Sequence, residues 1–586
     1  MLADSSSPAD ALLPVAHADP LACRPDLACR RAAAWHLHTL QLACIALALG
    51  TLVLPVALTH MPPLVDYPNH LARIWLLAGG VDQAPLDGIY SVDWSSATTN
   101  IGIDLLAATL GRLIGGWTLA PLLLGAAVLL PPLGAVLLNR AVFGGWHWWQ
   151  AGFAVLAWNS TLLAGFLNFQ IGLGLALLAA AMDPAISRRA GPFGVMPVRM
   201  GQGAALLVFH PFAAGLYGVL LAGLAFGAGD EPSWEKPPLR RRLWRAAVTA
   251  GLGVGAPVMG FLLLAPTLPG GHAPEGIYDL WAGYTAANKA TVLLSAIATY
   301  NIWLDIGAVL LLWAAARLAA SGPMLRCHAG LMFCTLALLA LTVLVPSTLG
   351  GTAYVDWRFP IMAVLTAAAA LRPSLQSTRA GQVMAVALML LALARTGWVA
   401  GIWQERQAHV TAVEDVLAFV PAGAAVLPVE HTGMGDTNWP RGRVLALGLP
   451  FYSHLPSLAV PLRHAFVPTL FTAPGKQPLR VLSPWAEFSV LEGSPAPVYY
   501  LRDFVPSPQL SYIIGYMAHW RERFDYILVL NAQVPDADDE ASIPGLELLS
   551  DRGFARVYRI LRTSDKGPDG RTRAYDDLHR VTNDGE

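Results

Sequence analysis

Uncharged apolar stretches recur along the first two thirds of the chain, and they constrain its fold more than any other feature. A helix of roughly 20 apolar residues is long enough to cross a bilayer. Of the 586 residues, 55% are hydrophobic and 13% are charged, whereas soluble domains carry roughly 25% charged residues. The sequence therefore predicts an α-helical polytopic membrane protein.

About eleven of these stretches are predicted to span the membrane. Arg24, Arg30 and Arg31 precede the first one, and basic residues collect on the cytoplasmic side, so we expect a cytoplasmic N-terminus. An odd number of spans then places the C-terminal region in the periplasm of a bacterial inner membrane. The predicted spans cover residues 35–59, 101–117, 118–139, 147–163, 165–182, 203–227, 246–266, 300–318, 328–345, 358–372 and 380–402.

Three arginines disagree with this count. Arg188, Arg189 and Arg199 fall on the outer side if all eleven stretches span the membrane. A nine-span alternative brings them inside by treating residues 147–182 as one broken span and 203–227 as a re-entrant hairpin. Both counts predict the same location for the two ends of the chain.

The character of the sequence changes after Trp403. Short apolar runs at 424–430, 524–531 and 554–560 are typical of β-strands, and residues 411–420 predict an amphipathic helix. We therefore expect a small periplasmic α/β domain after the spans. The predicted organisation is a disordered cytoplasmic tail (1–34), a transmembrane domain (35–402) with a long first periplasmic loop (60–100), the α/β domain (403–562) and a disordered tail (563–586).

The segment "PPLVDYPNHLAR", residues 62–73, places an acid, an imidazole and a guanidinium directly after the first span. Pro68 fits the first turn of a helix, so Asp66 is a natural N-cap, and His70 and Arg73 share one helix face. One interpretation is structural, with Asp66 as a helix cap. In the other, Asp66 is a base or metal ligand beside an anionic headgroup. Asn69→Ala is expected to be neutral.

A second polar segment, "GTAYVDWRFP" at 351–360, lies at the mouth of a later span on the same side. In an extended segment alternate residues point the same way, so Asp356 and Arg358 could form a salt bridge. Alternatively, Arg358 binds a phosphate with two hydrogen bonds while Trp357 stacks on a sugar.

Several other polar residues fall in or near the spans. Asp104 and Asp305 lie a few residues from outer span ends, and His210 with Pro211 breaks a span near mid-depth, where we favour a structural role for His210. The remaining candidates are in outer regions: a solvated loop with His272, Glu275 and Asp279, and a C-terminal stretch with His454, Arg463, His464 and Lys476 that is expected to help shape a substrate cleft.

This layout resembles the GT-C superfamily of integral-membrane glycosyltransferases. The shared features are an inside N-terminus, an acidic motif in the first outer loop, about eleven spans and an exported C-terminal α/β domain. The resemblance implies that the chain takes a sugar from a polyprenyl-phosphate carrier at the outer face. It implies a catalytic or metal-binding role for Asp66 and a phosphate-binding role for Arg358. The segments "DYPNHLAR" and "GFLNFQIGLGLALLA" also look like a bacterial subgroup of this kind.

We therefore expect inverting glycosyl transfer at the periplasmic face, onto a glycan, lipid or protein acceptor. Asp66 would act as the base, and His70 would orient it or share its proton. Arg358, with Arg73, would stabilise the departing phosphate. The substrate-binding residues expected from the sequence are Arg73, Asp104, Asp356, Trp357 and Arg358.

Three alternatives remain open from the sequence: a polysaccharide polymerase or ligase, a lipid-linked-sugar transporter or flippase, and a non-catalytic relative of the same architecture. A divalent metal is compatible with Asp66, although the motif does not require one, because the family often carries two acids where this chain has Asp66 alone. The net charge of −1 argues against a nucleic-acid partner.

Overall fold

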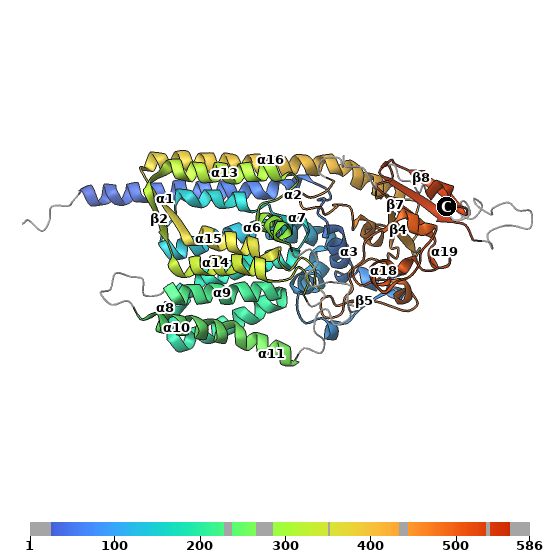
Figure 1. Ribbon diagram of the computed structural model, residues 1–586, viewed down its shortest axis with the longest axis horizontal. Helices are drawn as coiled ribbons and strands as arrows, with labels where there is room; N and C mark the ends of the chain where they lie inside the picture. Colours follow the sequence, from blue (N-terminus) through green and yellow to red (C-terminus); the bar gives the residue numbers. More distant parts are fainter. Residues whose placement is uncertain are drawn as a thin grey trace, which may run out of the picture.

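The protein consists of a helical bundle joined to a smaller α/β domain at one end (Figure 1). The computed structural model describes residues 25–227, 237–264, 285–349, 352–432, 443–534 and 540–562. The candidates His272, Glu275 and Asp279 lie outside these ranges. The main bundle helices are α1 (Pro25–Gly50), α2 (Leu54–Leu58), α6 (Gly116–Phe143), α8 (Leu167–Phe209), α9 (Pro211–Gly227), α10 (Leu239–Ala250), α11 (Ala256–Leu264), α13 (Ile302–Ala319), α14 (Ala329–Leu344), α15 (Arg358–Ala370) and α16 (Thr378–Leu417).

Within the described residues, six helices are long and apolar enough to cross a membrane. They are Trp35–Leu58, Gly116–Phe143, Leu167–Gly191, Leu239–Leu264, Ile302–Ala319 and Thr378–Leu417. Four shorter apolar helices accompany them: Phe193–Phe209, Pro211–Gly227, Ala329–Leu344 and Arg358–Ala370. The polytopic character predicted from the sequence is therefore present in the fold. The first helix begins at Pro25, so this part of the predicted N-terminal tail is helical.

Two of the predicted spans are not single long helices. In the predicted span 101–117, α4 (Gly102–Leu106), a π-helical turn (Ala107–Gly111) and α5 (Arg112–Ile114) follow one another as one short helix. This helix ends at Gly115, whose φ of 83° an L side chain rarely adopts. Residues 147–163 form a 3₁₀ helix, Trp148–Leu156, and then α7 (Ser160–Leu163), which starts where the Asn159 side chain accepts a bond from Leu162 N. Hydropathy alone does not detect these backbone breaks.

The helix labelled α8 is a hairpin. Its backbone leaves the helical region at Gly191 (φ 68°), and Arg199 on the second arm donates to Asp183 on the first, with Nε–Oδ1 2.7 Å. The second arm returns to the other end of the bundle, where Ile101 N donates to Val208 O. Arg188 and Arg189 therefore lie at the turn end, beside the end of α6.

This turn removes the disagreement over the three arginines. The sequence predicts one span at 203–227, but the chain has two apolar helices here, separated at His210. His210 consequently lies at a helix end and not at mid-depth. The turn at Gly191 falls in the gap between the predicted spans 165–182 and 203–227. The sequence missed that the helix Phe193–Phe209 begins ten residues before position 203 and ends at His210.

The α/β domain is built on a five-stranded sheet with the order β6-β4-β7-β9-β8. Strands β4 (Val426–Glu430), β7 (Tyr526–Leu530) and β9 (Ala555–Ile560) lie where the sequence predicts strands, joined by β6 (Ala496–Pro497) and β8 (Leu546–Asp551). Strand β4 is parallel to both of its neighbours, and β9 is antiparallel to both β7 and β8. The domain's helices are α17 (Ala459–Arg463), α18 (Pro508–Ile514) and α19 (Trp520–Arg523).

Among the contacts that join the two parts, three involve the elements around the site. Helix α16 runs without a break across the boundary predicted after residue 402, so the amphipathic segment 411–420 mostly continues this helix and is not a separate one. Strand β1 (Tyr90–Val92), in the segment between α3 and α4, pairs with β5 (Leu479–Val481) of the domain. Helix α3 (Tyr67–Leu77) is tied to it by Asn69, whose side chain donates to Thr469 O and accepts from Phe471 N. Asn69 is fully buried, so we no longer expect Asn69→Ala to be neutral.

Two further elements complete the bundle. Helix α12 (Ala286–Leu293) precedes α13, and strands β2 (Ala320–Cys327) and β3 (Leu371–Leu375) form an antiparallel pair. Asp305 in α13 is buried against Arg395 of α16, with Oδ1–Nη2 3.1 Å, and accepts from Thr299 N. These contacts give Asp305 a structural role.

Candidate active site

A cavity of about 550 Å³ lies where the bundle end meets the α/β domain. This volume is within the range of small-molecule sites. One wall is the start of α3, a second is made by the ends of α8, α9 and α15, and the third is the α/β domain. The lining residues used below are Asp66, His70, Phe166, Phe169, His210, Phe212, Arg358, Glu430, His454, Lys476, Gln477 and Glu492.

Asp66 is held by its backbone against the turn that precedes α8. Asp66 N donates to Ala164 O at 3.0 Å, and Gly165 follows with φ of 92°. A Cβ on Gly165 would lie 2.8 Å from both Cβ and N of Asp66, so only glycine leaves room here. Asp66 occupies the N-cap position of α3, but its side chain makes no capping hydrogen bond. The capping interpretation of Asp66 is therefore wrong.

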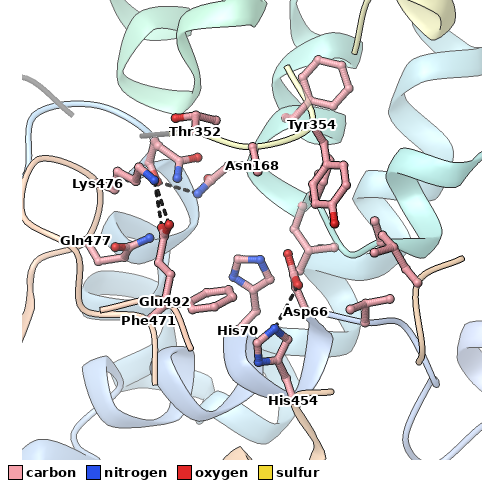
Figure 2. A pocket seen from close by; sticks show the side chains of 18 of the residues that line it. Asp66, His70, Asn168, Thr352, Tyr354, His454, Phe471, Lys476, Gln477 and Glu492 are labelled. Carbon is pink, nitrogen blue, oxygen red and sulfur yellow. Dashed lines mark hydrogen bonds and ion pairs between the residues drawn. The ribbon is translucent and has the colours of Figure 1, made fainter. Parts of the chain in front are cut away.

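The Asp66 side chain instead faces the cavity and meets His454 (Figure 2). Asp66 Oδ1 lies 3.4 Å from His454 Nε2. Burial raises the pKa of Asp66 to about 8; Glu492 raises it further, while Arg358 and Arg73 lower it. Burial lowers the pKa of His454 to about 4, so this imidazole is neutral at pH 7. A neutral imidazole beside a carboxyl with a pKa near 8 suits proton exchange in the physiological range.

His70 lines the cavity next to this pair without bonding to Asp66. Its Nδ1 accepts from Arg73 Nη2 at 3.2 Å, and it also hydrogen-bonds the backbone of Gly165. Burial first, and then Arg73 and His454, hold the pKa of His70 well below its usual value. In the described part of the chain, His454 therefore occupies the place beside Asp66 where we expected His70.

Arg73 and Asp104 form a fully buried ion pair, with Nε–Oδ1 2.6 Å and no exposure of either side chain. Neither belongs to the described residues that line the cavity. The sequence treats both as substrate-binding residues, whereas the fold places them behind His70. Their contacts position the imidazole.

Arg358 is the first residue of α15, and its guanidinium packs against aromatic rings. The guanidinium carbon lies 4.7 Å from the ring centroid of Phe166 and 5.3 Å from that of Phe212. Nη1 donates to the carbonyls of Ala353 and Tyr354, at 3.0 and 2.7 Å. These contacts fix the planar group and leave Nε buried, with no hydrogen-bond partner among the described residues.

Asp356 and Trp357 do not line the cavity in the described structure. Asp356 pairs with Lys289, with Oδ2–Nζ 2.6 Å, and accepts from Ser347 Oγ at 2.9 Å. The expected alternative, an Asp356–Arg358 salt bridge, is therefore replaced by a pair with Lys289. The chain enters α15 here and is not extended, so the alternation argument fails. The ring of Trp357 packs on Tyr354, with centroids 4.9 Å apart.

The α/β domain contributes a further ion pair to the cavity. Lys476 Nζ lies 3.0 and 2.9 Å from the two carboxylate oxygens of Glu492, on the opposite side from Asp66 and His454 (Figure 2). Of the four C-terminal residues expected to shape a cleft, His454 and Lys476 line the cavity. Arg463 instead donates to Val420 O, and His464 packs against Trp75.

His210 also lines the cavity, at the start of α9. Its Nδ1 accepts from Phe212 N at 3.2 Å, and its ring lies edge-on to Phe169 with centroids 5.6 Å apart. The expected structural role is consistent with these contacts, although the bonded backbone group is an N–H rather than a carbonyl.

The described residues contain no group of three or more His, Cys, Asp or Glu side chains that could hold a metal ion. The charged groups that act on Asp66 are Glu492, Arg358 and Arg73, and two of these are cations. This donor set does not fit a divalent metal.

Sequence reasoning missed Glu430, Gln477 and Glu492 as cavity residues. Glu430 ends a predicted strand, and the carboxyl ends of parallel strands are frequent ligand sites, so a signal for it existed. Gln477 and Glu492 lie in irregular segments that carry no periodic pattern.

Comparisons with known proteins do not give a family for this chain. No family model matches the sequence, and no curated protein matches it. One similar solved structure is the crystal structure of ArnT from Cupriavidus metallidurans bound to undecaprenyl phosphate, with a TM-score of 0.45 and 11% identity. The match covers 89% of this chain and 98% of that chain. A likeness of this strength carries no information about the chemistry of the cavity.

Proposed function

We propose that the protein is an inner-membrane glycosyltransferase that moves a sugar from a polyprenyl-phosphate carrier to an acceptor at the periplasmic face. The observation that carries this proposal is that the Asp66 carboxyl and the Arg358 guanidinium line one cavity at the bundle end. Glycosyl transfer from a lipid phosphate needs a base for the incoming hydroxyl and a cation for the departing phosphate.

In the proposed reaction, the acceptor hydroxyl oxygen attacks the anomeric carbon of the donor sugar with inversion. The bond from this carbon to the phosphate oxygen breaks, and its electrons stay on the phosphate. Asp66, in its carboxylate form, takes the hydroxyl proton. The neutral His454, with Nε2 3.4 Å from Oδ1, would donate an Nε2–H to the carboxylate. Once the product has left, Asp66 releases the proton that it has taken to water.

Arg358 is proposed to bind the phosphate, with its plane already fixed by the backbone carbonyls and aromatic rings. A preorganised cation costs little reorganisation when the phosphate charge grows. The apolar faces of Phe166, Phe169 and Phe212 suit the first isoprene units of the carrier. Arg73 and Asp104 hold His70, and Asp356 with Trp357 supports the segment that enters α15.

The test follows the fate of the carrier-linked sugar with purified protein in nanodiscs. Polyprenyl-phosphate sugars are supplied with a membrane extract as acceptor source, and donor consumption is measured by mass spectrometry. Asp66→Asn is expected to reduce donor consumption by about 10²- to 10⁴-fold, the usual contribution of a general base. The matched control is Asp82→Asn, an exposed acid of the same loop that pairs with Arg112.

The outcomes separate the alternatives. Equal reduction by Asp66→Asn and Asp82→Asn would contradict the proposed base. An intact donor that appears on the opposite leaflet of a liposome would indicate a flippase. Unchanged donor in every wild-type assay, across hexosyl and pentosyl carriers, would favour a non-catalytic protein.

A further inference from the structure

The cavity has two walls of different hydrogen-bonding character. On the bundle side, the described cavity residues include one buried donor without a hydrogen-bond partner, Arg358 Nε. On the side of the α/β domain, Glu430 Oε2, His454 Nδ1 and Gln477 Oε1 are buried and lack hydrogen-bond partners within the described part of the chain. A buried polar atom without a partner costs about 1–3 kcal/mol, so such atoms in a cavity point to a ligand.

Glu430 has the clearest position among these groups. It is the last residue of β4, between the parallel strands β6 and β7, where ligands commonly bind. No hydrogen bond or ion pair connects its side chain with the described residues. Burial raises its pKa to about 8. At neutral pH this carboxyl retains its proton, and it can donate one hydrogen bond and accept another.

Another buried acid of the domain, Glu540, has hydrogen-bond partners, and one of them is His431, the residue after Glu430. His431 Nε2 lies 2.6 Å from Glu540 Oε2, and Arg556 Nη1 lies 2.9 Å from the other oxygen. These two bonds lower the pKa of Glu540 to about 2, against the effect of its burial. Unlike Glu540, Glu430 has a carboxyl oxygen without a partner among the described residues, so it can hydrogen-bond a ligand in the cavity.

The charge of this wall disfavours an anionic acceptor. Its acids are Glu430 and Glu492, and its lysine, Lys476, contacts both oxygens of Glu492. Among the described residues of this wall, a phosphate would meet two carboxyl groups and a lysine that already contacts one of them. Gln477 lies beside Glu492 and Lys476, across the cavity from Asp66 (Figure 2). The wall therefore offers carboxyl and amide oxygens, which pair well with hydroxyl groups.

From this arrangement we infer that the α/β-domain wall is an acceptor subsite for an uncharged carbohydrate, whose hydroxyls hydrogen-bond to Glu430 and Gln477. This inference rests on the proposed function, and it narrows the acceptor from a glycan, lipid or protein to a sugar hydroxyl. The sugar would then place another of its hydroxyls toward Asp66.

Saturation-transfer NMR on the full-length protein in nanodiscs tests the subsite without a donor. The probes are the methyl glycosides of glucose, galactose, mannose and N-acetylglucosamine, with glucosamine and glycerol 3-phosphate for comparison. At least one methyl glycoside is expected to bind. Glu430→Ala and Gln477→Ala should each weaken its binding by about tenfold, the loss of one buried hydrogen bond. Glu430→Gln should retain most of the binding, because an amide still donates and accepts.

The matched control is Glu487→Ala, which removes an exposed acid of the same domain and should leave binding unchanged. Equal binding of the glycosides to wild type and Glu430→Ala would overturn the inference, and so would no glycoside binding at all. Tighter binding of glucosamine that disappears in Glu430→Gln would assign the wall to an amine instead. Competition by glycerol 3-phosphate at this wall would assign it to an anion.

Failure of the subsite can be distinguished from failure of the proposed function. Arg358→Gln should abolish donor turnover while methyl glycoside binding stays intact. If wild type turns over no donor but binds glycosides through Glu430, the transferase proposal fails and the subsite stands. If donor turnover depends on Asp66 but the acceptor KM is the same in Glu430→Ala, the transferase stands and the subsite fails.

Discussion

The imidazole of His454 lies 3.4 Å from the carboxylate of Asp66, and the two residues come from opposite parts of the chain. Asp66 belongs to the loop that follows the first apolar helix, whereas His454 belongs to the α/β domain after the last one. The candidate site is therefore complete only when the domain is docked on the bundle.

The rate of sugar transfer should rise as the pH increases to about 8. The pKa of Asp66 is raised to about 8, so its carboxyl keeps its proton at pH 7 and becomes a base as the pH increases. We expect kcat/KM to increase about tenfold per pH unit below 8 and to level off above it. Because Glu492 raises this pKa, Glu492→Gln should shift the profile to lower pH. Glu487→Gln serves as the control, and a profile that falls between pH 6 and 8 would contradict the assignment.

Arg358→Lys is expected to be far from conservative. A lysine keeps the charge but cannot bond the carbonyls of Ala353 and Tyr354 and still present a planar group to a phosphate. We expect kcat to fall roughly 10²-fold, as for the loss of a donor to a developing anion. Steady-state kinetics on the donor measure this. Arg317→Lys, at an exposed position of α13, should behave as wild type. Similar kinetics for both variants would show that Arg358 does not contact the phosphate.

Gly165→Ala should displace Asp66. The new Cβ would lie 2.8 Å from Asp66 Cβ and N, and the φ of 92° is unfavourable for alanine. We expect a loss of about 1–3 kcal/mol in stability and a larger loss of activity. Thermal unfolding and the donor assay report the two effects. Gly125→Ala in α6 is the matched control, since no atom lies within 4 Å of its added Cβ. A fully active Gly165→Ala variant would mean that the position of Asp66 is not critical.

Asn69→Ala should loosen the junction between the bundle and the domain. The variant removes one bond to Thr469 O and one from Phe471 N, and both backbone groups are then left without this partner. We expect a loss of about 2–4 kcal/mol in unfolding free energy. Hydrogen exchange at residues 466–472 should increase while that of α6 stays the same. Unchanged exchange at 466–472 would show that these bonds do not hold the junction.

The sequence could indicate that Asp66 and Arg358 belong to the same end of the bundle, because each lies at an apolar stretch boundary on the same predicted side. It could also place three strands of the α/β domain, since short apolar runs between turn residues have that meaning. These inferences depend on local patterns. The direction of each helix depends on the turn before it, which a hydropathy pattern does not reveal. At Gly191 one such turn sends the second arm of α8 back along the first.

The partners of the charged residues could not be predicted in this way. Arg73 was expected at a phosphate and lies instead against Asp104, and Asp356 was expected near Arg358 and lies against Lys289. Each pair joins segments that the helix pattern leaves unrelated. Buried ions are stable only when such distant partners meet, so their choice is a property of the packed fold.

The pairing of β1 with β5 also sets the order in which the protein can mature. The ribosome makes the loop that carries Asp66 early and the segment that carries β5 near the end. At translation rates of about 5–20 residues per second, the interval between them is on the order of tens of seconds. During this time the loop lacks both its partner strand and His454. If the proposed function holds, a newly made chain is inactive until its last part has been made and has docked on the bundle, so the activity begins only when synthesis is complete.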